Sequence, residues 1–308
     1  MKHLERPGGI LQMSTKSIYI FLLLISTVLF AGCGLDQKGL VIMTDHSYRP
    51  SVVGTQDDGF TSPDGLLWKE GKLYMADEGG NAFRIWSGPN NSITLCDASI
   101  GVMSPEDLVV DKQGNIFFTD DDAGGLWKID NHGNASRFVT PEQGPISTEG
   151  IVLNPDQSMF IGDGEVHKVF RVTQNGDVSV FLGEEYGITK AESMVYTEKG
   201  DLYIADNEDN ILYLLTPDKK LYRPIENQPG FSPETIWYDK GVLYITDSRD
   251  HKLFRYTPED GLRTIAIFGG VLEAVNGITT DEKGDIYISV QTDLKRRLGY
   301  VLKLEPIA

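Results

Sequence analysis

Two neighbouring stretches decide the fold of this chain: Glu192-Ser193-Met194-Val195-Tyr196 and Leu202-Tyr203-Ile204-Ala205-Asp206. The first is a short apolar run that follows an acidic residue. The second alternates apolar and aromatic residues and ends in an aspartate. Between them lies a turn that contains Gly200. Short runs of this kind, separated by turn residues, are typical of an antiparallel β-hairpin.

The same pattern occurs six times along the chain. The residues that open the six copies are Asp64, Glu106, Glu149, Glu192, Glu234 and Asn276. They follow one another at steps of 42, 43, 43, 42 and 42 residues. Each copy has room for four short strands, and this repeat length is typical of a propeller blade. The sequence therefore predicts an all-β fold, a six-bladed β-propeller with four-stranded antiparallel blades.

The two ends of the repeat array indicate how the ring closes. The sixth copy ends after its third strand, at residues 300–304. A stretch at 39–53 precedes the first copy and contains a strand-like run at 40–43. We predict that this N-terminal stretch supplies the missing outer strand of the last blade and covers its open edge. The predicted propeller spans residues 39–308.

The N-terminus has the pattern of an export signal. Lys16 precedes an apolar run at 18–30, which is too short to span a bilayer comfortably. The run is followed by Ala31, Gly32 and Cys33, which resemble a bacterial lipoprotein box in which the cysteine receives the lipid. We expect a lipoprotein signal peptide at 1–32, a tether at 33–38 and lipidation of Cys33 at the bacterial cell envelope. The alternative is an ordinary signal peptide in which Cys33 has no special role.

Charge limits the partners that this chain can take. Lys and Arg total 28 against 45 Asp and Glu, a formal net charge of −17. Such a surface repels nucleic acid and anionic lipid head groups, and it attracts cations. We therefore expect a monomer that binds a small molecule and meets the membrane only through its lipid. The second cysteine, Cys96, lies in a strand-like run, and we expect it to be a buried apolar residue.

The six opening residues form the candidate site. The first strand of each blade lines the central channel of a propeller, so these side chains are expected to meet at one channel mouth. Five carboxylates and one amide, without His or Cys, suit Ca²⁺ or another hard cation such as Mg²⁺. Two such charges roughly 8 Å apart repel by about 2 kcal/mol at an effective dielectric constant near 20. The alternative is that each acid caps its own strand by accepting backbone N–H bonds.

Several of these segments resemble the senescence-marker-protein/gluconolactonase/luciferin-regenerating-enzyme-like group, and they also overlap with NHL-type repeats. The resemblance is carried by Ser62-Pro63-Asp64-Gly65-Leu66, Glu192-Ser193-Met194-Val195-Tyr196, Tyr244-Ile245-Thr246-Asp247-Ser248 and Asn276-Gly277-Ile278. It implies a six-bladed propeller with a divalent cation, often calcium, at the channel mouth. Several members of the group hydrolyse lactones or related esters.

The resemblance also implies roles for individual residues. Asp64, Glu192 and Glu234 occupy the places of the family's Glu, Asn and Asp metal ligands, so each of them departs from the family residue. Glu234 stands where the family has its general base. Glu149 stands where the family often has a substrate-contacting Asn. The remaining candidate ligands, Glu106 and Asn276, come from the repeat pattern alone.

Two further features have an ordinary and a functional interpretation. A second acidic series ends the second strand of five copies, and the position four residues later holds His167 in one copy and His251 in another. We interpret these histidines as turn residues. The sixth copy lacks this aspartate, and its following loop carries Lys295, Arg296 and Arg297. Arg296 and Arg297 are candidates to grip an anionic group of the substrate, or they are solvated surface charge.

Two functions remain open from the sequence. The first is a divalent-cation-dependent hydrolase of a lactone or related small ester, with Glu234 as the base. The second is a non-catalytic propeller that binds a ligand or protein at the cell surface. A Gly-x-Ser-x-Gly motif is missing from the sequence, which argues against a serine hydrolase of the α/β type.

Overall fold

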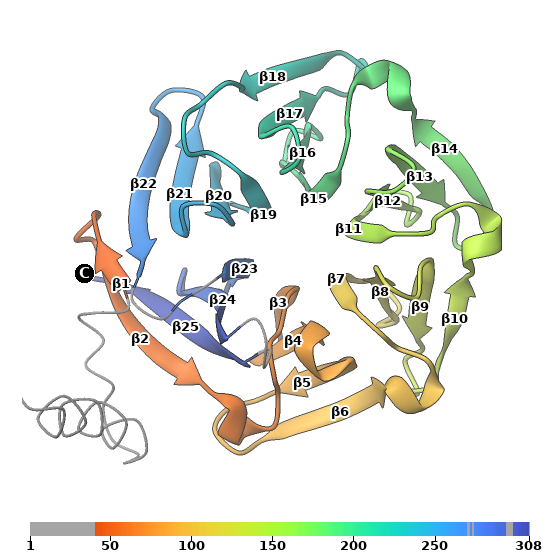
Figure 1. Ribbon diagram of the computed structural model, residues 1–308, viewed down its shortest axis with the longest axis horizontal. Coiled ribbons are helices and arrows are strands. Elements are labelled where there is room, and N and C mark those ends of the chain that lie inside the picture. The colour runs from red at the N-terminus through yellow and green to blue at the C-terminus, as the bar shows by residue number, and fades with distance from the viewer. Residues whose placement is uncertain (1–40, 270–271, 273, 294–297, 308) are drawn as a thin grey trace, which may run out of the picture. The chain divides into compact units, whose positions relative to one another are not determined.

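The computed structural model describes residues 41–269, 272, 274–293 and 298–307. In this part of the chain, six antiparallel sheets are arranged around a central axis (Figure 1). Each sheet is one blade, and its first strand lies innermost. The prediction of a six-bladed β-propeller is confirmed.

The first three blades are each built from consecutive strands. Blade one contains β3 (Leu66–Lys69), β4 (Lys72–Asp77), β5 (Ala82–Trp86) and β6 (Ser92–Asp97). Blade two contains β7 (Pro105–Val110), β8 (Ile116–Asp120), β9 (Leu126–Ile129) and β10 (Ala135–Val139). Blade three contains β11 (Thr148–Leu153), β12 (Met159–Asp163), β13 (Lys168–Val172) and β14 (Val178–Leu182).

The last three blades include the strands that join the two ends of the chain. Blade four contains β15 (Ala191–Tyr196), β16 (Leu202–Asp206), β17 (Ile211–Leu215) and β18 (Leu221–Ile225). Blade five contains β19 (Pro233–Asp239), β20 (Val242–Asp247), β21 (Lys252–Thr257), β22 (Gly261–Phe268) and β1 (Val41–Met43). Blade six contains β23 (Ala274–Thr280), β24 (Ile286–Asp293), β25 (Leu298–Pro306) and β2 (Tyr48–Gly54).

Ring closure uses the predicted N-terminal stretch. The outer strand of blade six is β2, which pairs with β25 so that Val52 lies opposite Leu302. The strand-like run at 40–43 overlaps a second strand of this stretch, β1, which extends blade five by pairing with β22. Strand β1 has three residues, whereas β2 has seven and covers most of the long β25 edge. The longer strand satisfies more backbone groups on the open edge.

The core is divided among the gaps between blades. Each of six buried apolar clusters joins residues of two adjacent blades, as Phe83 of blade one stacks on Phe118 of blade two at 5.0 Å. The second strands are covered on both sides, so every residue of β8 and β16 is buried. Cys96 belongs to one of these clusters and burial raises the pKa of its thiol to about 12, which confirms that it is an apolar core residue.

Glycines after the ring residues allow the innermost strands to approach one another. Gly65, Gly150 and Gly277 directly follow Asp64, Glu149 and Asn276. A Cβ at any of the three would overlap the backbone of the next blade, at Glu106, Glu192 and Asp64 respectively. The missing side chain therefore sets the width of the channel at this level. The helices in the described segments are three-residue 3-10 turns, and none is long and apolar enough to cross a membrane.

Candidate functional site

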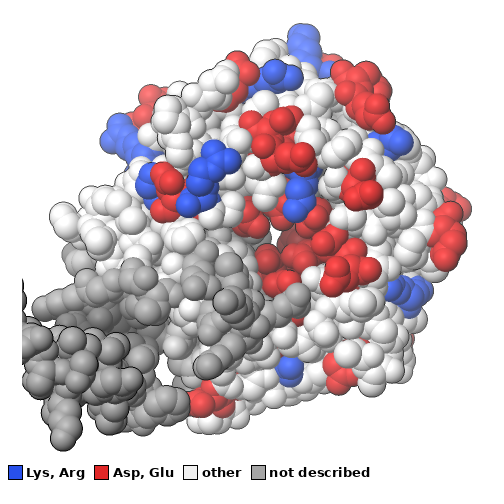
Figure 2. Space-filling model, in the orientation of Figure 1, with Lys and Arg blue, Asp and Glu red and all other residues white. Residues whose placement is uncertain are grey.

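The six predicted site residues lie at the start of the six innermost strands and face one channel mouth. Asp64 precedes β3, and the others are near the first residues of their strands: Glu106 in β7, Glu149 in β11, Glu192 in β15, Glu234 in β19 and Asn276 in β23. Figure 2 shows Asp and Glu side chains gathered around and inside the central hollow. The structure thus brings together the residues from six blades that the repeat pattern singled out, and they form the candidate site.

The electrostatics of this ring show how crowded its charges are. Burial raises the pKa of Asp64 well above its ordinary value, and repulsion by Glu234 and Glu78 adds to this effect. Burial, followed by repulsion from Asp64 and other acids, likewise raises the pKa of Glu106. Carboxylates on different blades therefore influence one another across the hollow, and several of them hold protons more tightly than an exposed carboxylate does.

One cation lies inside this ring, and it was not among the predicted site residues. The Lys190 ammonium Nζ is 3.0 Å from Glu149 Oε1 and 2.9 Å from Glu192 Oε2. Burial is the largest effect on Glu149 and raises its pKa to about 7, although Lys190 opposes it. Burial and repulsion by Glu234 raise the pKa of Glu192, again against Lys190. The two carboxylates on blades three and four thus share one ammonium.

On the opposite side of the ring, the carboxylates accept hydrogen bonds from neutral side chains. The Asn276 amide donates from Nδ2 to Asp64 Oδ2 at 3.0 Å, which joins blades six and one. The Asn207 amide donates to Glu234 Oε2 at 3.1 Å. The Ser104 hydroxyl donates to Glu106 Oε1 at 3.0 Å. These neutral donors orient the carboxylates without cancelling their charge.

A second tier of polar residues surrounds the ring, and the sequence shows it at a fixed repeat position. It consists of the residues that directly follow the second strand in five blades, together with the equivalent residue of blade six, which lies within β24: Glu78, Asp121, Gly164, Asn207, Ser248 and Gln291. Three of these contact the next blade, two by accepting from a serine hydroxyl and the third by donating to a ring carboxylate. Glu78 accepts from the Ser104 hydroxyl at 3.4 Å, Asp121 accepts from the Ser147 hydroxyl, and Asn207 contacts Glu234 as described above. Glu78 and Asp121 add two carboxylates to the mouth.

The capping role falls on the second acidic series rather than on the ring. Its members are Asp77, Asp120, Asp163, Asp206 and Asp247, all fully buried. Asp163, for example, accepts backbone N–H bonds from four residues: Ile146, Ser147, Glu165 and Val166. In the hydrogen bonds of the described residues, the ring carboxylates accept from side chains instead.

The histidines next to this series are turn residues, as expected. His167 has φ 52° and His251 has φ 50°, and the equivalent Asn81, Gly124 and Asn210 are also left-handed. His167 Nδ1 lies 2.7 Å from the Thr189 carbonyl oxygen, so its ring is used in a loop contact. Cys33, Arg296 and Arg297 lie outside the described residues, as do the signal segment and the tether.

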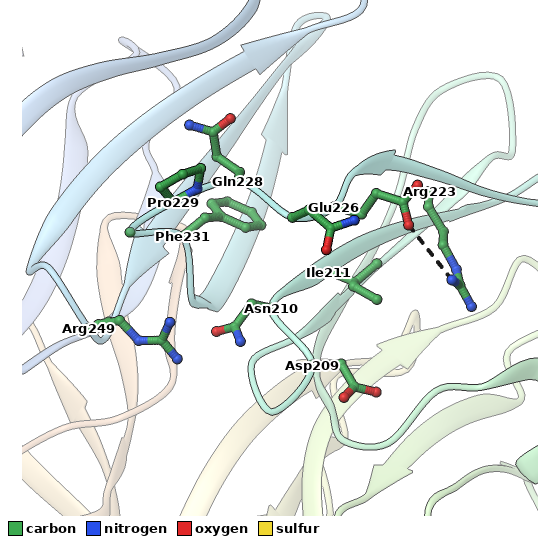
Figure 3. Close-up of a pocket in the computed structure, with 11 residues that line it drawn as sticks. Asp209, Asn210, Ile211, Arg223, Glu226, Gln228, Pro229, Phe231 and Arg249 are labelled. Carbon is green, nitrogen blue, oxygen red and sulfur yellow. Dashed lines mark ion pairs between the residues drawn. The ribbon is translucent and has the colours of Figure 1, made fainter.

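A separate groove lies between blades four and five (Figure 3). Its volume is about 360 Å³, and its lining includes Asn210, Phe231, Arg249 and the ion pair of Arg223 with Glu226, whose atoms are 3.7 Å apart. None of the six ring residues lines this groove. It is therefore a surface feature apart from the candidate site.

The ring fits a hard divalent cation in donor type and charge. Its donors are carboxylate and amide oxygens, and among the described residues the Lys190 ammonium pairs with two of the five ring carboxylates. Within the described residues, however, no three acidic, His or Cys side chains converge as a preassembled metal centre. The chain thus provides suitable ligands for Ca²⁺ or Mg²⁺ without a finished coordination sphere.

The fold and this ring define the class of molecule, a six-bladed β-propeller with an acidic channel mouth. No protein-family model matches the sequence, and no curated protein matches it. Solved structures with the same fold include a gluconolactonase from Xanthomonas campestris, at 15% identity and a TM-score of 0.68, which covers 89% of this chain and 96% of that one.

Two other similar structures are described as a lyase and as a calcium-binding protein. A virginiamycin B lyase from Staphylococcus aureus has 16% identity and a TM-score of 0.63, and the match covers 84% of this chain and 100% of that one. The calcium-binding protein regucalcin from Agrobacterium tumefaciens has 13% identity and a TM-score of 0.58, and the match covers 83% of this chain and 95% of that one. Identities this low establish a shared fold and leave the activity to be argued from the site.

Proposed function

We propose that this protein is a divalent-cation-dependent hydrolase of a lactone or related small ester, acting at the acidic channel mouth. The observation that carries the proposal is the charge of the ring: five carboxylates from five blades lie around one hollow, and in the described part of the chain an ion pair with Lys190 reaches only two of them. The similarity in fold to a gluconolactonase and to regucalcin supports this choice of chemistry.

The residues that would hold the cation lie mainly on the side away from Lys190. Asp64, Glu234 and Asn276 are the first candidates, with Glu106 beside them, while Glu149 and Glu192 are already paired with the ammonium. A bound divalent cation polarises a carbonyl and lowers the pKa of an attacking water.

Glu234 is the proposed base. The Asn207 amide holds Glu234 Oε2 at 3.1 Å and fixes the plane of the carboxylate. The other oxygen, Oε1, is then placed to take the proton of the attacking water. In the hydrolysis of a lactone, water adds to the carbonyl carbon, the ring C–O bond breaks, and the proton passes to the departing oxygen.

The test combines metal binding with turnover. Ca²⁺ should raise the thermal unfolding midpoint of metal-free protein by several degrees, because a ligand that binds only the folded state stabilises it. A panel of aldonolactones and small esters should show turnover that needs the cation. Glu234→Gln should lower kcat at least about 100-fold, in the range of lost acid–base catalysis. Glu259→Gln, an exposed acid in the β21–β22 turn, is the matched control.

The second candidate function is a non-catalytic propeller that binds a ligand. It is favoured by Lys190, which already forms ion pairs with two of the six ring residues. A cation-dependent rise in the unfolding midpoint without turnover of any lactone or ester would support this function and reject the hydrolase.

We also infer a location and a set of partners from the sequence. The protein is exported and held at the bacterial cell envelope by a lipid on Cys33, and it works as a monomer on a small molecule. The excess of acidic residues supports the absence of nucleic-acid partners.

A further inference from the structure

Lys190 differs from the equivalent residue of every other blade. The position two residues before the ring residue holds serine in four blades: Ser62, Ser104, Ser147 and Ser232. Blade six has Ala274 there, and blade four has Lys190. Lysine is therefore a departure from the repeat. It places a positive charge inside the acidic ring.

Gly164 is the matching departure in blade three. The other five blades have a side chain at this second-tier position, whereas blade three has glycine. A Cβ at Gly164 would lie 3.1 Å from Lys190 Cγ and Cε and 3.3 Å from Cδ. The aliphatic stem of Lys190 therefore occupies the room that a side chain at this position would take. The two departures from the repeat are complementary in shape.

The charge state of Lys190 follows from its surroundings. Its side chain is 28% exposed, and its ammonium contacts two carboxylates at 3.0 and 2.9 Å. Although burial opposes it, attraction by Glu192 and Glu149 raises the pKa of Lys190 above its ordinary value. The side chain is an ammonium at neutral pH, which excludes it as an amine nucleophile.

We propose that Lys190 is a permanent internal cation of the channel, which fills the side formed by Glu149 and Glu192 and confines a divalent cation to the opposite side, at Asp64 and Asn276. This inference rests on the proposed metal site for its second half. The other part of the inference, that Lys190 is an internal cation, does not depend on a bound metal. Gly164 is the residue that makes room for it.

Calorimetric titration of metal-free protein with Ca²⁺ tests the confinement. Wild-type protein should bind one Ca²⁺ per chain. Lys190→Ser restores the serine of the repeat and frees two carboxylates, so it should bind Ca²⁺ at least about tenfold more tightly or take a second ion. Lys190→Arg keeps the charge and should bind as wild type does. Lys252→Ser is the control, since Lys252 is 25% exposed and pairs with Asp250 at 2.7 Å.

Thermal unfolding without divalent ions tests the internal cation separately. At pH 8, Lys190→Ser should lower the midpoint by several degrees more than Lys252→Ser, because Glu149 and Glu192 lose their shared ammonium. Gly164→Ser should lower the midpoint in wild type but have little effect in the Lys190→Ser background, because its steric conflict is with Lys190.

The outcomes separate the two proposals. Equal Ca²⁺ affinity and stoichiometry in wild type and Lys190→Ser would overturn the confinement. If no variant binds Ca²⁺, the proposed metal site fails, while a lowered midpoint for Lys190→Ser without metal would still support the internal cation. An unchanged midpoint in that experiment would overturn it.

Discussion

Single residues decide the charge of the channel mouth, and Lys190 shows what the sequence could and could not predict. The ring residues were predictable because they open a repeated strand. Lys190 was missed because the prediction followed positions where the repeat is kept. Comparison of the position two residues earlier, serine in four blades, reveals the exception. Its pairing with both Glu149 and Glu192 depends on how blades three and four approach, which only the structure provides.

Glu149 gives the metal-free protein a pH-dependent stability. Burial raises its pKa from an ordinary 4.5 to about 7, so the folded state binds this proton more tightly than the unfolded chain does. Its stabilising effect is complete below the ordinary value and is lost as the pH rises through about 7. From pH 5 to pH 8, Glu149 should lower the free energy of unfolding by about 2.5 kcal/mol.

Urea unfolding of metal-free protein at pH 5, 6.5 and 8 measures this effect. Glu149→Gln should be less sensitive to pH than wild type by the same amount, because glutamine does not titrate. Glu259→Gln should keep the wild-type dependence. An undiminished pH dependence in Glu149→Gln would show that this carboxyl is not protonated in the folded state.

At the scale of the element, the sequence predicts the position of the innermost strands but not how closely neighbouring strands approach one another. The acidic residue, the apolar run and the turn placed each first strand correctly. The glycine after the ring residue was visible at 65, 150 and 277, but its purpose depends on the neighbouring blade. At Asp107 the same position holds a carboxylate that accepts the Ile151 backbone N–H at 3.1 Å and so joins two blades.

Gly277→Ala tests the close approach of these strands. The added Cβ would overlap the carbonyl oxygen of Asp64 and lie 2.9 Å from the Leu66 nitrogen. Because both contacts are to backbone, blades six and one must separate, and the free energy of unfolding should fall by about 2 kcal/mol or more. Gly269→Ala is the control, since nothing lies within 4 Å of its Cβ position, and it should change stability by less than about 0.5 kcal/mol. Equal effects in the two variants would contradict this account.

At the scale of the whole molecule, the repeat period alone predicted the number of blades and their strand order. It could not predict which N-terminal strand closes the ring, because 40–43 and 48–54 lie in the same stretch and either could pair with an open edge. The structure uses both, β1 on blade five and β2 on blade six. The Tyr48 and Tyr244 hydroxyls, 3.3 Å apart, join the closing strand to blade five.

The proposed lipid on Cys33 would attach the whole molecule to the membrane. Labelling of growing cells with radioactive palmitate should mark the wild-type protein, and Cys33→Ser should lose the label and leave the membrane fraction. Cys96→Ser is the control, because the Cys96 thiol is buried in the core. Retention of label by Cys33→Ser would reject the lipoprotein signal.

The closing strand has a consequence for how the ring assembles. Arg49 of β2 and its partner Glu305 of β25 are 256 positions apart in sequence, so the earliest strand of the last blade is made long before the strand it pairs with. Until the final residues emerge, β2 has an unpaired edge and blade six has only part of its sheet. Folding is therefore expected to finish slowly and in one late step, since distant pairings carry a large entropic cost. A chain truncated before residue 298 would lack β25 and would keep its ring open.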